Sequence, residues 1–331
     1  MTARRVGVVG AGVTGLTAAR ALAGDARVVV LDAADTPGGR LLTLRRGTAV
    51  ADAGAQFFTV REDAFAHQVA RWKADGVPVR VWSHGFPQAG HIADGPDGVE
   101  RRSNANPRYH VAGGMAELAR HLARGLDVRL RTAVRAARLA GSGWRLETGD
   151  NGELFVDDLL ITTPLPASLA LLGPDAPACA VGALEPIRYA PCVALVVVLD
   201  GPSAVPEPGA VQLAEGPVSW LSDNARKGLS RVPALTVHAV ADAAERLVDA
   251  TDATVRSELE PLLAPWLGDA QIVDAAVRRW RHARPLVEHP DRAVVSTCGP
   301  SRVAFAGDAF AEPRIEGAVR SGLAAAERLR S

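Results

Sequence analysis

The sequence has few residues with the side chains that metal or thiol chemistry needs. Its three cysteines, Cys179, Cys192 and Cys298, are scattered, with no CxxC pair and no histidine at ligand spacing. This pattern gives no metal site, and it favours small buried hydrophobic side chains over ligands or a nucleophile. Lysine is rarer still, since Lys73 and Lys227 are the only two among 37 basic residues.

The sequence also lacks a charge excess and a long apolar run. Acidic and basic residues balance at 37 each, which gives no support for nucleic acid or an anionic membrane as the main partner. No apolar run approaches the ~18–20 residues that cross a bilayer. The first residues, MTARRVGVVG, lack the apolar core and cleavage site of a signal peptide, so we expect a cytoplasmic protein. A chain of 331 residues is expected to form two packed domains.

A glycine-rich turn near the N-terminus carries the first functional signal. Residues 5–9 form a predicted strand, residues 10–15 read Gly-Ala-Gly-Val-Thr-Gly, and a predicted helix runs to about residue 23. A second strand over 27–31 ends at Asp32. The order of strand, turn, helix, strand and acid predicts a βαβ unit that binds a dinucleotide.

Each residue of the turn has a physical reason to be there. Gly10 permits the tight turn, Gly12 lets the backbone approach a diphosphate, and Gly15 lets the helix pack closely on the strand. The diphosphate would meet the amide groups at the start of the helix, at Val13 and Thr14. Asp32 is placed to accept hydrogen bonds from ribose hydroxyls.

Two further segments favour FAD over NAD. Gly38, Gly39 and Arg40 follow the second strand, where glycine lets the chain pass close to a cofactor and Arg40 can reach phosphate or the flavin edge; the alternative is a surface turn with a solvated arginine. Near the C-terminus, a buried strand over 303–307 ends in Gly307 and Asp308, and this carboxylate could bind the ribityl chain. A helix then begins at Glu316, Gly317 and Ala318, and its N-terminus would stabilise negative charge on reduced flavin.

The rest of the chain predicts an α/β fold in which an α+β domain with a mixed or antiparallel sheet is inserted. We expect helices at about 63–75, 115–123, 251–266 and 316–329. We expect strands at 79–82, near 92, and at 128–131, 134–137, 144–148, 154–156, 159–162, 192–199, 211–213, 218–221, 234–239 and 272–280, with a turn at Asp150, Asn151 and Gly152.

Over nearly its whole length the chain resembles the flavin monoamine-oxidase superfamily, and within it the renalase family, especially its bacterial form. The run Asp-Ala-Gly-Ala-Gln-Phe-Phe-Thr at 52–59 is similar to that family's Asp-x-Gly-Ala-Gln-Tyr-Phe-Thr, with Phe57 in place of the tyrosine. Further matches are Gly113-Gly114-Met115, Trp220–Asn224, Val237–Ala239 and, most distinctive, Arg279–Pro285.

The resemblance implies a two-dinucleotide-binding (GR2-type) FAD domain with an inserted substrate domain, and FAD held non-covalently. It places the FAD domain at 1–75, 103–165 and 290–331 and the substrate domain at 76–102 and 166–289. It adds cofactor contacts at Ala55, Gln56, Phe57 and Phe58, at Thr163, and at Val134 through backbone groups near adenine. The implied reaction is oxidation of the 2- and 6-dihydro isomers of NAD(P)H to NAD(P)+, with O2 reoxidising the flavin to give H2O2.

Three functions stay open on the sequence. Amine oxidases of this superfamily typically place a lysine, through water, against flavin N5, whereas Lys73 lies in a helical stretch and Lys227 in a polar loop over 223–228. Oxidation of a dihydropyridine needs positioning and no general base. An amine oxidase or desaturase with an apolar substrate, and a non-catalytic FAD-binding protein, are the alternatives.

The candidates that would position a dinucleotide substrate come from the segments that match the family. Trp280 could stack on nicotinamide, His238 and Asn224 could bind its carboxamide, and arginines could meet phosphates. The alternatives are a core aromatic for Trp280, a satisfied buried histidine for His238 and a solvated surface charge for an arginine such as Arg281. The full set of predicted positioning residues is Asn224, His238, Trp280, Arg281, His282 and Arg284.

Overall fold

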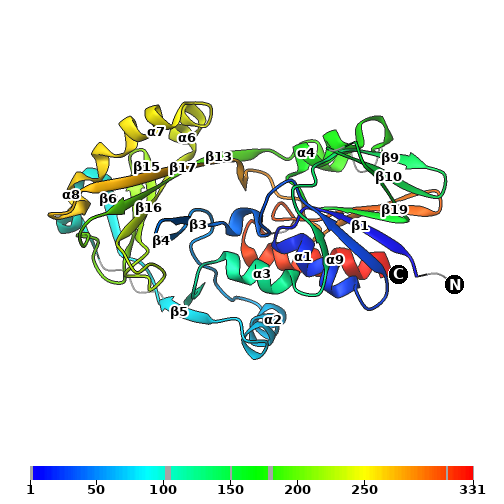
Figure 1. Ribbon diagram of the computed structural model, residues 1–331, viewed down its shortest axis with the longest axis horizontal. Helices are drawn as coiled ribbons and strands as arrows, with labels where there is room; N and C mark the ends of the chain where they lie inside the picture. The colour runs from blue at the N-terminus through cyan, green and yellow to red at the C-terminus, as the bar shows by residue number, and fades with distance from the viewer. Residues whose placement is uncertain (1–2, 101–105, 150, 178–181, 311, 331) are drawn as a thin grey trace. The chain divides into compact units, whose positions relative to one another are not determined.

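The computed structural model describes residues 3–100, 106–149, 151–177, 182–310 and 312–330 (Figure 1). The chain forms two compact units. Unit 1 comprises Met1–Gly39, Leu118–Tyr189 and Arg284–Ser331, and unit 2 comprises Arg40–Glu117 and Ala190–Ala283. The predicted functional division into an FAD domain and a substrate domain has other bounds, and it stays a prediction.

Runs of strands are separated by one or more helices along the chain. The helices are α1 (Val13–Leu22), α2 (Asp63–Ala74), α3 (Ala116–Ala123), α4 (Leu165–Leu172), α6 (Ala241–Leu247), α7 (Asp252–Leu259), α8 (Ala264–Leu267) and α9 (Ile315–Arg330). The strands are β1 (Arg5–Val9), β2 (Arg27–Leu31), β3 (Thr43–Arg46), β4 (Ala49–Asp52), β5 (Val79–Ser83), β6 (Gln88–His91), β7 (Arg108–Val111), β8 (Asp127–Arg129), β9 (Val134–Ala140), β10 (Gly143–Thr148), β11 (Glu153–Val156), β12 (Asp158–Ile161), β13 (Tyr189–Leu199), β14 (Ala210–Glu215), β15 (Val218–Asp223), β16 (Ala234–Ala239), β17 (Ile272–Pro285), β18 (Val294–Cys298) and β19 (Ser301–Phe305).

Unit 1 is built on a six-stranded sheet in the order β18-β19-β12-β1-β2-β8. The strands β19, β12, β1, β2 and β8 are parallel, and β18 runs antiparallel to β19. Short, almost wholly apolar strands of this kind are covered on both faces. Alternate residues such as Val9, Leu31 and Ile161 pack into one core with the smaller sheet β11-β10-β9 and with α4. This is the predicted dinucleotide-binding architecture.

A close helix pair completes unit 1. Helices α1 and α9 lie side by side (Figure 1), and the contact is so tight that a Cβ added at Gly322 would stand 2.5 Å from the carbonyl oxygen of Thr14. Glycine at this position of α9 therefore sets the distance between the two helices.

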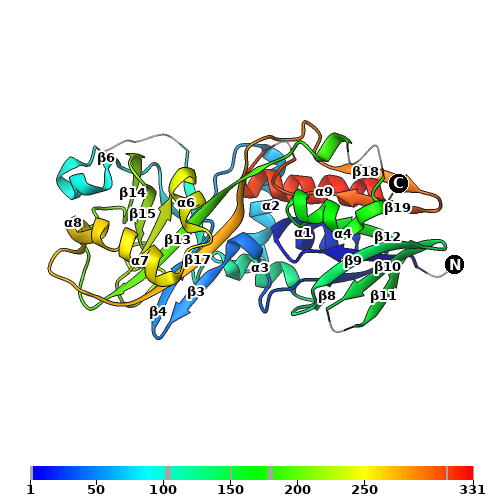
Figure 2. The ribbon, with the colours of Figure 1, turned by 90° about the horizontal axis from the view of Figure 1, so that it is seen from above.

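Unit 2 contains the predicted mixed sheet, in the order β17-β13-β16-β15-β14-β6. The pairs β13–β16, β15–β16 and β14–β15 are antiparallel, and β6 joins β14 in parallel. Helices α6, α7 and α8 lie along this sheet (Figure 2) and pack into it with Leu247, Leu259 and the fully buried Trp266. The expected α/β fold with a separate mixed-sheet part is confirmed.

Two predicted elements have other bounds in the structure, and a third lies partly outside the described residues. The single helix expected at 251–266 is wrong, because α7 ends before Pro261, a short 3-10 turn follows, and α8 is a separate turn of helix. The strand expected at 272–280 continues to Pro285 as β17. The turn expected at Asp150 lies partly outside the described residues, although Asn151 has a left-handed φ of 60°.

Among the described residues, no helix is both long enough and apolar enough to cross a membrane.

The α1–α9 contact predicts a position-specific loss of stability. Gly322→Ala is expected to lower the free energy of unfolding by about 1–3 kcal/mol, because its methyl group collides with a backbone oxygen that cannot move alone. Urea denaturation measures the loss, and Gly24→Ala is the control, since a Cβ there meets nothing within 4 Å. Equal stability of the two variants would contradict the packing described.

Candidate functional site

The glycine-rich turn of unit 1 is shaped by its own backbone. Gly10 has a φ of 110°, which disfavours any side chain. A Cβ at Gly15 would stand 2.0 Å from the Gly10 carbonyl oxygen, so only glycine fits. The Thr162 hydroxyl, just after β12, donates to the same carbonyl over 3.1 Å. The turn therefore lies at the carboxyl edge of the sheet, where open α/β sheets bind ligands.

The start of α1 has the features of an anion cradle. Gly12 is the N-cap, no side chain caps the helix, and its first turn has no acidic residue. Backbone N–H groups of the first turn lack partners within the helix, so those of Val13, Thr14 and Gly15 need acceptors from outside it. A Cβ at Gly12 would meet nothing within 4 Å, so the space over the turn is open. These residues fit a diphosphate.

The Gly38-Gly39 loop lies directly against this turn. The Gly38 N–H donates to the Ala11 carbonyl over 2.8 Å. Gly39 has a φ of 53°, and a Cβ there would lie 3.8 Å from Gly12 Cα. The sequence predicted both glycine segments separately, and the structure brings them together at one edge of the sheet.

Asp32 is fixed in the same place. One carboxylate oxygen accepts from the Ala11 N–H over 2.6 Å and the other from the Ala34 N–H over 2.8 Å. The side chain stays half-exposed, and each oxygen keeps a lone pair for a ribose hydroxyl.

The segment after β19 meets the same edge. The Gly307 N–H donates to the Ser321 hydroxyl over 2.9 Å, which ties the strand end to α9. Asp308 is half-buried beside it, and Glu316 is buried in the first turn of α9. A Cβ at Gly317 would stand 2.1 Å from the Glu312 carbonyl oxygen, so the chain before α9 folds onto the helix start. The strand itself ends at Phe305, two residues earlier than expected.

Two other predicted cofactor residues are also in unit 1. Thr163 follows β12 and shares a hydrogen bond of 2.9 Å with the Ser168 hydroxyl. Val134 begins β9 and is half-buried. Their roles with a cofactor stay predictions.

In unit 2, hydrogen bonds of Arg40 and Trp280 connect β17 to the chain at residues 40 and 53, next to the predicted cofactor segment at 55–58. The Trp280 indole N–H donates to the Ala53 carbonyl over 2.9 Å. Arg40 donates from one guanidinium nitrogen to the carbonyls of His282 and Ala283, over 3.1 Å each. A Cβ at Gly54 would stand 2.1 Å from the Arg40 carbonyl oxygen. The match to the family at 52–59 and the match at 279–285 therefore form one block.

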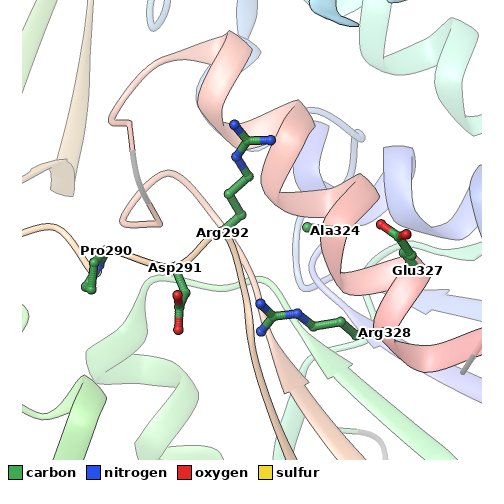
Figure 3. A pocket seen from close by; sticks show the side chains of 6 residues that line it. All are labelled: Pro290, Asp291, Arg292, Ala324, Glu327 and Arg328. Carbon is green, nitrogen blue, oxygen red and sulfur yellow. The ribbon is translucent and has the colours of Figure 1, made fainter.

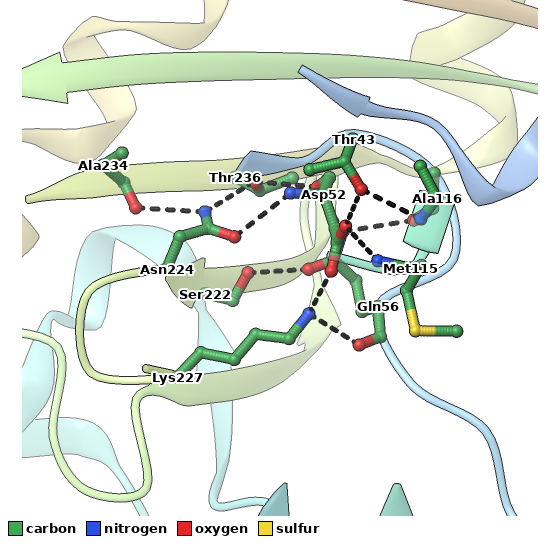
Figure 4. A network of polar contacts seen from close by, with 11 residues as sticks. Thr43, Asp52, Gln56, Met115, Ala116, Ser222, Asn224, Lys227, Ala234 and Thr236 are labelled. Atoms are coloured by element: carbon green, nitrogen blue, oxygen red, sulfur yellow. Dashed lines mark hydrogen bonds and ion pairs between the residues drawn. The ribbon is translucent and has the colours of Figure 1, made fainter. Parts of the chain in front are cut away.

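A buried ion pair lies at the centre of unit 2 (Figure 4). Lys227 Nζ is 2.7 Å from Asp52 Oδ2, and both side chains are fully buried. The same ammonium donates to the Gln56 carbonyl over 2.7 Å and lies 4.6 Å from the centre of the Trp82 ring. Burial lowers the pKa of Lys227, and the Asp52 carboxylate opposes the shift. Lys227 is thus a buried core residue. The sequence predicted a polar loop at this position and did not predict that the lysine is buried.

The other partners of Asp52 complete a closed network. Asp52 Oδ1 accepts from the Thr43 hydroxyl over 2.6 Å and from the Met115 N–H over 2.9 Å. The Gln56 amide donates to the Asp52 carbonyl over 2.6 Å, and its own oxygen accepts from the Ser222 hydroxyl over 3.0 Å. The residues drawn in Figure 4 come from β3, the end of β4 and the turn after it, the start of α3, β15, β16 and the loop between β15 and β16.

An aromatic cluster of Phe57, Trp82, Phe86 and Trp220 lies beside this network. Its ring centres are 4.8–6.0 Å apart where rings touch, and Phe57 and Trp82 remain half-buried. Trp220 is paired in register with His238 across β15 and β16. We name this group the aromatic cluster.

Two histidines next to the aromatic cluster are neutral. Burial first, and then the positive charge of Lys227, lowers the pKa of both His110 and His238 to about 4. Asp52 opposes the shift at His110, and the Ala53 backbone opposes it at His238. Among the described residues, none offers a hydrogen-bond partner to three buried polar atoms, His110 Nδ1, His238 Nε2 and Trp220 Nε1, and this is costly unless a ligand or water supplies one.

Other predicted positioning residues are engaged elsewhere. The Asn224 amide is buried, donates to the Ala234 carbonyl and the Thr236 hydroxyl, and accepts from the Asp52 N–H. Both of its N–H bonds are used, so no donor is left for a ligand. Arg281 is exposed and paired with Asp249, and Arg284 is exposed. Of the predicted set, His238, Trp280 and His282 lie close to residues 53–54 or Arg40.

Unit 1 also has a surface hollow of about 640 Å³ (Figure 3). It is lined by Pro290, Asp291, Arg292, Ala324, Glu327 and Arg328, none of them a predicted site residue. Mixed charges around an open hollow do not define a ligand.

Within the described residues, Cys192 is not a reactive thiol and no metal site is found. Burial raises the pKa of the Cys192 thiol to about 12, so it is a protonated thiol at neutral pH. Cys179 lies outside the described residues. In the part of the chain that the structure describes, no three His, Cys, Asp or Glu residues gather as a metal site would require.

Comparison with protein families gives two matches. The model of a family described as flavin containing amine oxidoreductase matches residues 80–330. The model of the NAD(P)-binding Rossmann-like domain matches residues 8–89, which include the glycine-rich turn and Asp32.

Solved structures with the same fold are distant in sequence. A protein described as a protoporphyrinogen oxidase, from Exiguobacterium sp. 255-15, superposes with a TM-score of 0.75 at 16% identity over 100% of this chain and 99% of its own. Cyclohexylamine oxidase from Brevibacterium oxydans IH-35A gives 0.73 at 15% over 99% of each chain. Putrescine oxidase bound to putrescine gives 0.71 at 15% over 98% of each. At this identity the likeness shows the fold alone.

The open cradle at Gly12 predicts a separation of folding from cofactor binding. We expect Gly12→Val to fold, because a Cβ there meets no protein atom within 4 Å, and to lose FAD at least about tenfold, because the side chain fills the approach of the diphosphate. Flavin absorbance per protein measures this, with Gly24→Val as the control for an equally open glycine. Yellow protein with full flavin content from the Gly12 variant would refute the cradle.

The two lysines predict opposite chemical reactivity. An amine-acylating reagent is expected to modify the exposed Lys73 and to leave Lys227 unmodified in the native protein, because the buried ammonium is hydrogen-bonded and unreachable. Peptide mass spectrometry measures the two yields, and denatured protein, in which both lysines react, is the control. Equal modification in the native protein would contradict the buried pair.

Proposed function

This chain belongs to the flavin-containing amine oxidoreductase family, and we propose that it is an FAD-dependent oxidase of a small organic substrate with O2 as the electron acceptor. The family implies FAD, and the described residues of unit 1 fit it. Bound FAD would supply a two-electron acceptor that takes a hydride from the substrate.

The residues that would hold the cofactor are those at the carboxyl edge of the unit 1 sheet. The start of α1 would bind the diphosphate, Asp32 a ribose, Val134 the adenine through its backbone, and Asp308 the ribityl chain. The first turn of α9 would offer its backbone N–H groups to the flavin pyrimidine ring. The glycine loop after β2 adds Gly39 and Arg40 as predicted contacts, and the resemblance adds Thr163 and residues 55–58. Every contact is non-covalent.

We infer the class of substrate from the aromatic and uncharged side chains that lie around Lys227. The aromatic cluster and two neutral imidazoles adjoin a fixed positive charge, and the nearby carboxylates Asp52 and Asp223 are hydrogen-bonded within the protein. Such surroundings penalise an ammonium and favour a neutral amine with an apolar body. A free amine can lose hydride from its α-carbon and a proton from nitrogen, which gives an imine.

The second candidate substrate is a 2- or 6-dihydro isomer of NAD(P)H. Two observations favour it. Lys227 is fully buried and bonded to Asp52 and Gln56, so it is not exposed to hold a water at the flavin, and loss of hydride from a dihydropyridine gives the aromatic NAD(P)+ with no base. The Trp280 indole is fixed by its hydrogen bond to Ala53, and the Arg278 guanidinium lies over its ring at 4.6 Å. Such a ring could stack on a nicotinamide while the arginine supplies positive charge for a phosphate.

Anaerobic mixing separates the candidates. The purified protein is mixed without O2 with an apolar monoamine, with 6-dihydro-NAD and with 6-dihydro-NADP, and bleaching of the flavin band is followed. Bleaching by the amine alone supports amine oxidation, and bleaching by a dihydro isomer alone supports the renalase-type reaction. H2O2 on admission of air checks the acceptor. If no compound of either class bleaches the flavin, the protein binds FAD without this chemistry, and the proposal is wrong.

A further inference from the structure

We infer that Lys227 is a positioning residue that holds the Ala53–Phe58 segment in place through the main-chain carbonyl of Gln56. The inference rests on the proposed function in one respect only, namely that this segment lines the flavin. Its physical basis lies wholly within unit 2.

The Lys227 ammonium is enclosed by protein groups. One N–H meets Asp52 Oδ2 and one meets the Gln56 carbonyl, each over 2.7 Å. The third side of the ammonium faces the Trp82 ring at 4.6 Å. A fully buried ammonium that is bonded to Asp52 and Gln56 and covered by the Trp82 ring is not available to hold a water against a cofactor. Its chemical role is therefore to fix protein groups.

The group that it fixes is the turn that follows β4. Within this turn, the Gln56 side chain folds back to the carbonyls of Asp52 and Gly54, over 2.6 and 3.1 Å. The turn is thus closed on itself, and Lys227 and Ser222 attach it to the loop after β15 and to β15 itself. Phe57 and Phe58 follow directly, and the Phe58 N–H is bonded to the Tyr109 carbonyl over 2.8 Å.

Removal of the lysine alone would confuse two effects. It would free the Gln56 carbonyl, and it would also leave Asp52 charged and buried without a partner, which destabilises the whole unit. Neutralising both residues separates them. The pair Asp52→Asn with Lys227→Met has no buried charge. The amide that replaces the carboxylate keeps an oxygen for Thr43 and Met115, but nothing donates to the Gln56 carbonyl.

The experiment is hydrogen exchange, followed by mass spectrometry of peptides that span 53–58. In the double variant we expect exchange in this segment at least about tenfold faster than in the wild type, while the melting temperature stays within about 5 °C. Lys73→Met, which removes the only other lysine, from the surface of α2, is the matched control and is expected to exchange like the wild type. Unchanged exchange at 53–58 in the folded double variant would overturn the inference.

Two further measurements complete the test. If the double variant does not fold, Lys227→Met alone is examined below its melting temperature, and exchange at 53–58 is compared with exchange in the β16 peptide, which reports the general loss of stability; faster exchange confined to 53–58 is expected, and an equal rise in both peptides would overturn the inference. In flavin-loaded protein, we expect the double variant to show a shifted flavin spectrum and a kcat at least about tenfold lower, more than a loss of global stability explains. Wild-type kcat and spectrum in that variant would overturn the inference. If the wild type binds no flavin, the proposed function fails, and the exchange comparison still decides the role of Lys227.

Discussion

The buried ion pair of Asp52 and Lys227 is the interaction on which the arrangement of unit 2 depends. Two opposite charges without solvent are stable only when every donor and acceptor around them has a partner, because desolvation costs several kcal/mol for each ion. The protein meets this condition by bringing together β3, the end of β4, the residue before α3 and the β15–β16 loop. Burial first, and then the positive charge of Lys227, also lowers the pKa of the neighbouring His110 and His238, so both are neutral imidazoles.

The predicted site of unit 1 consists mainly of exposed backbone groups, whereas the network of unit 2 consists of buried side chains. Its parallel strands end at one edge, where glycine at 10, 12, 15, 38 and 39 brings two stretches of backbone together and leaves the start of α1 open. This edge provides hydrogen-bond donors for a diphosphate and carboxylates for hydroxyl groups. Unit 2 provides rings and neutral imidazoles instead. The two surfaces fit the two parts of the proposed reaction, which are a bound dinucleotide and an apolar or planar substrate.

The sequence predicted unit 1 far better than the core of unit 2. A βαβ with a glycine-rich turn is local, so its residues lie close together in the chain and its spacing is sufficient. The Asp52–Lys227 pair joins residues 175 positions apart, and nothing in the loop at 223–228 distinguishes a buried lysine from a solvated one. The polar amide of Asn224 suggested a hydrogen bond to a bound nicotinamide, but both of its N–H groups donate to protein atoms. His110, Trp82 and Trp220 were missed as a group because only the sheet register and β7 bring them together. The helix expected at 251–266 failed because Pro261 interrupts its hydrogen bonds.

The most direct measurement is the visible absorption spectrum of the purified protein, recorded before denaturation and again on the soluble fraction after it. Our account predicts a bound flavin spectrum in the native protein and recovery of FAD in solution afterwards, since every proposed contact is non-covalent. A colourless protein that takes up no FAD when the cofactor is added would contradict the account, and flavin that stays with the denatured chain would contradict the non-covalent site.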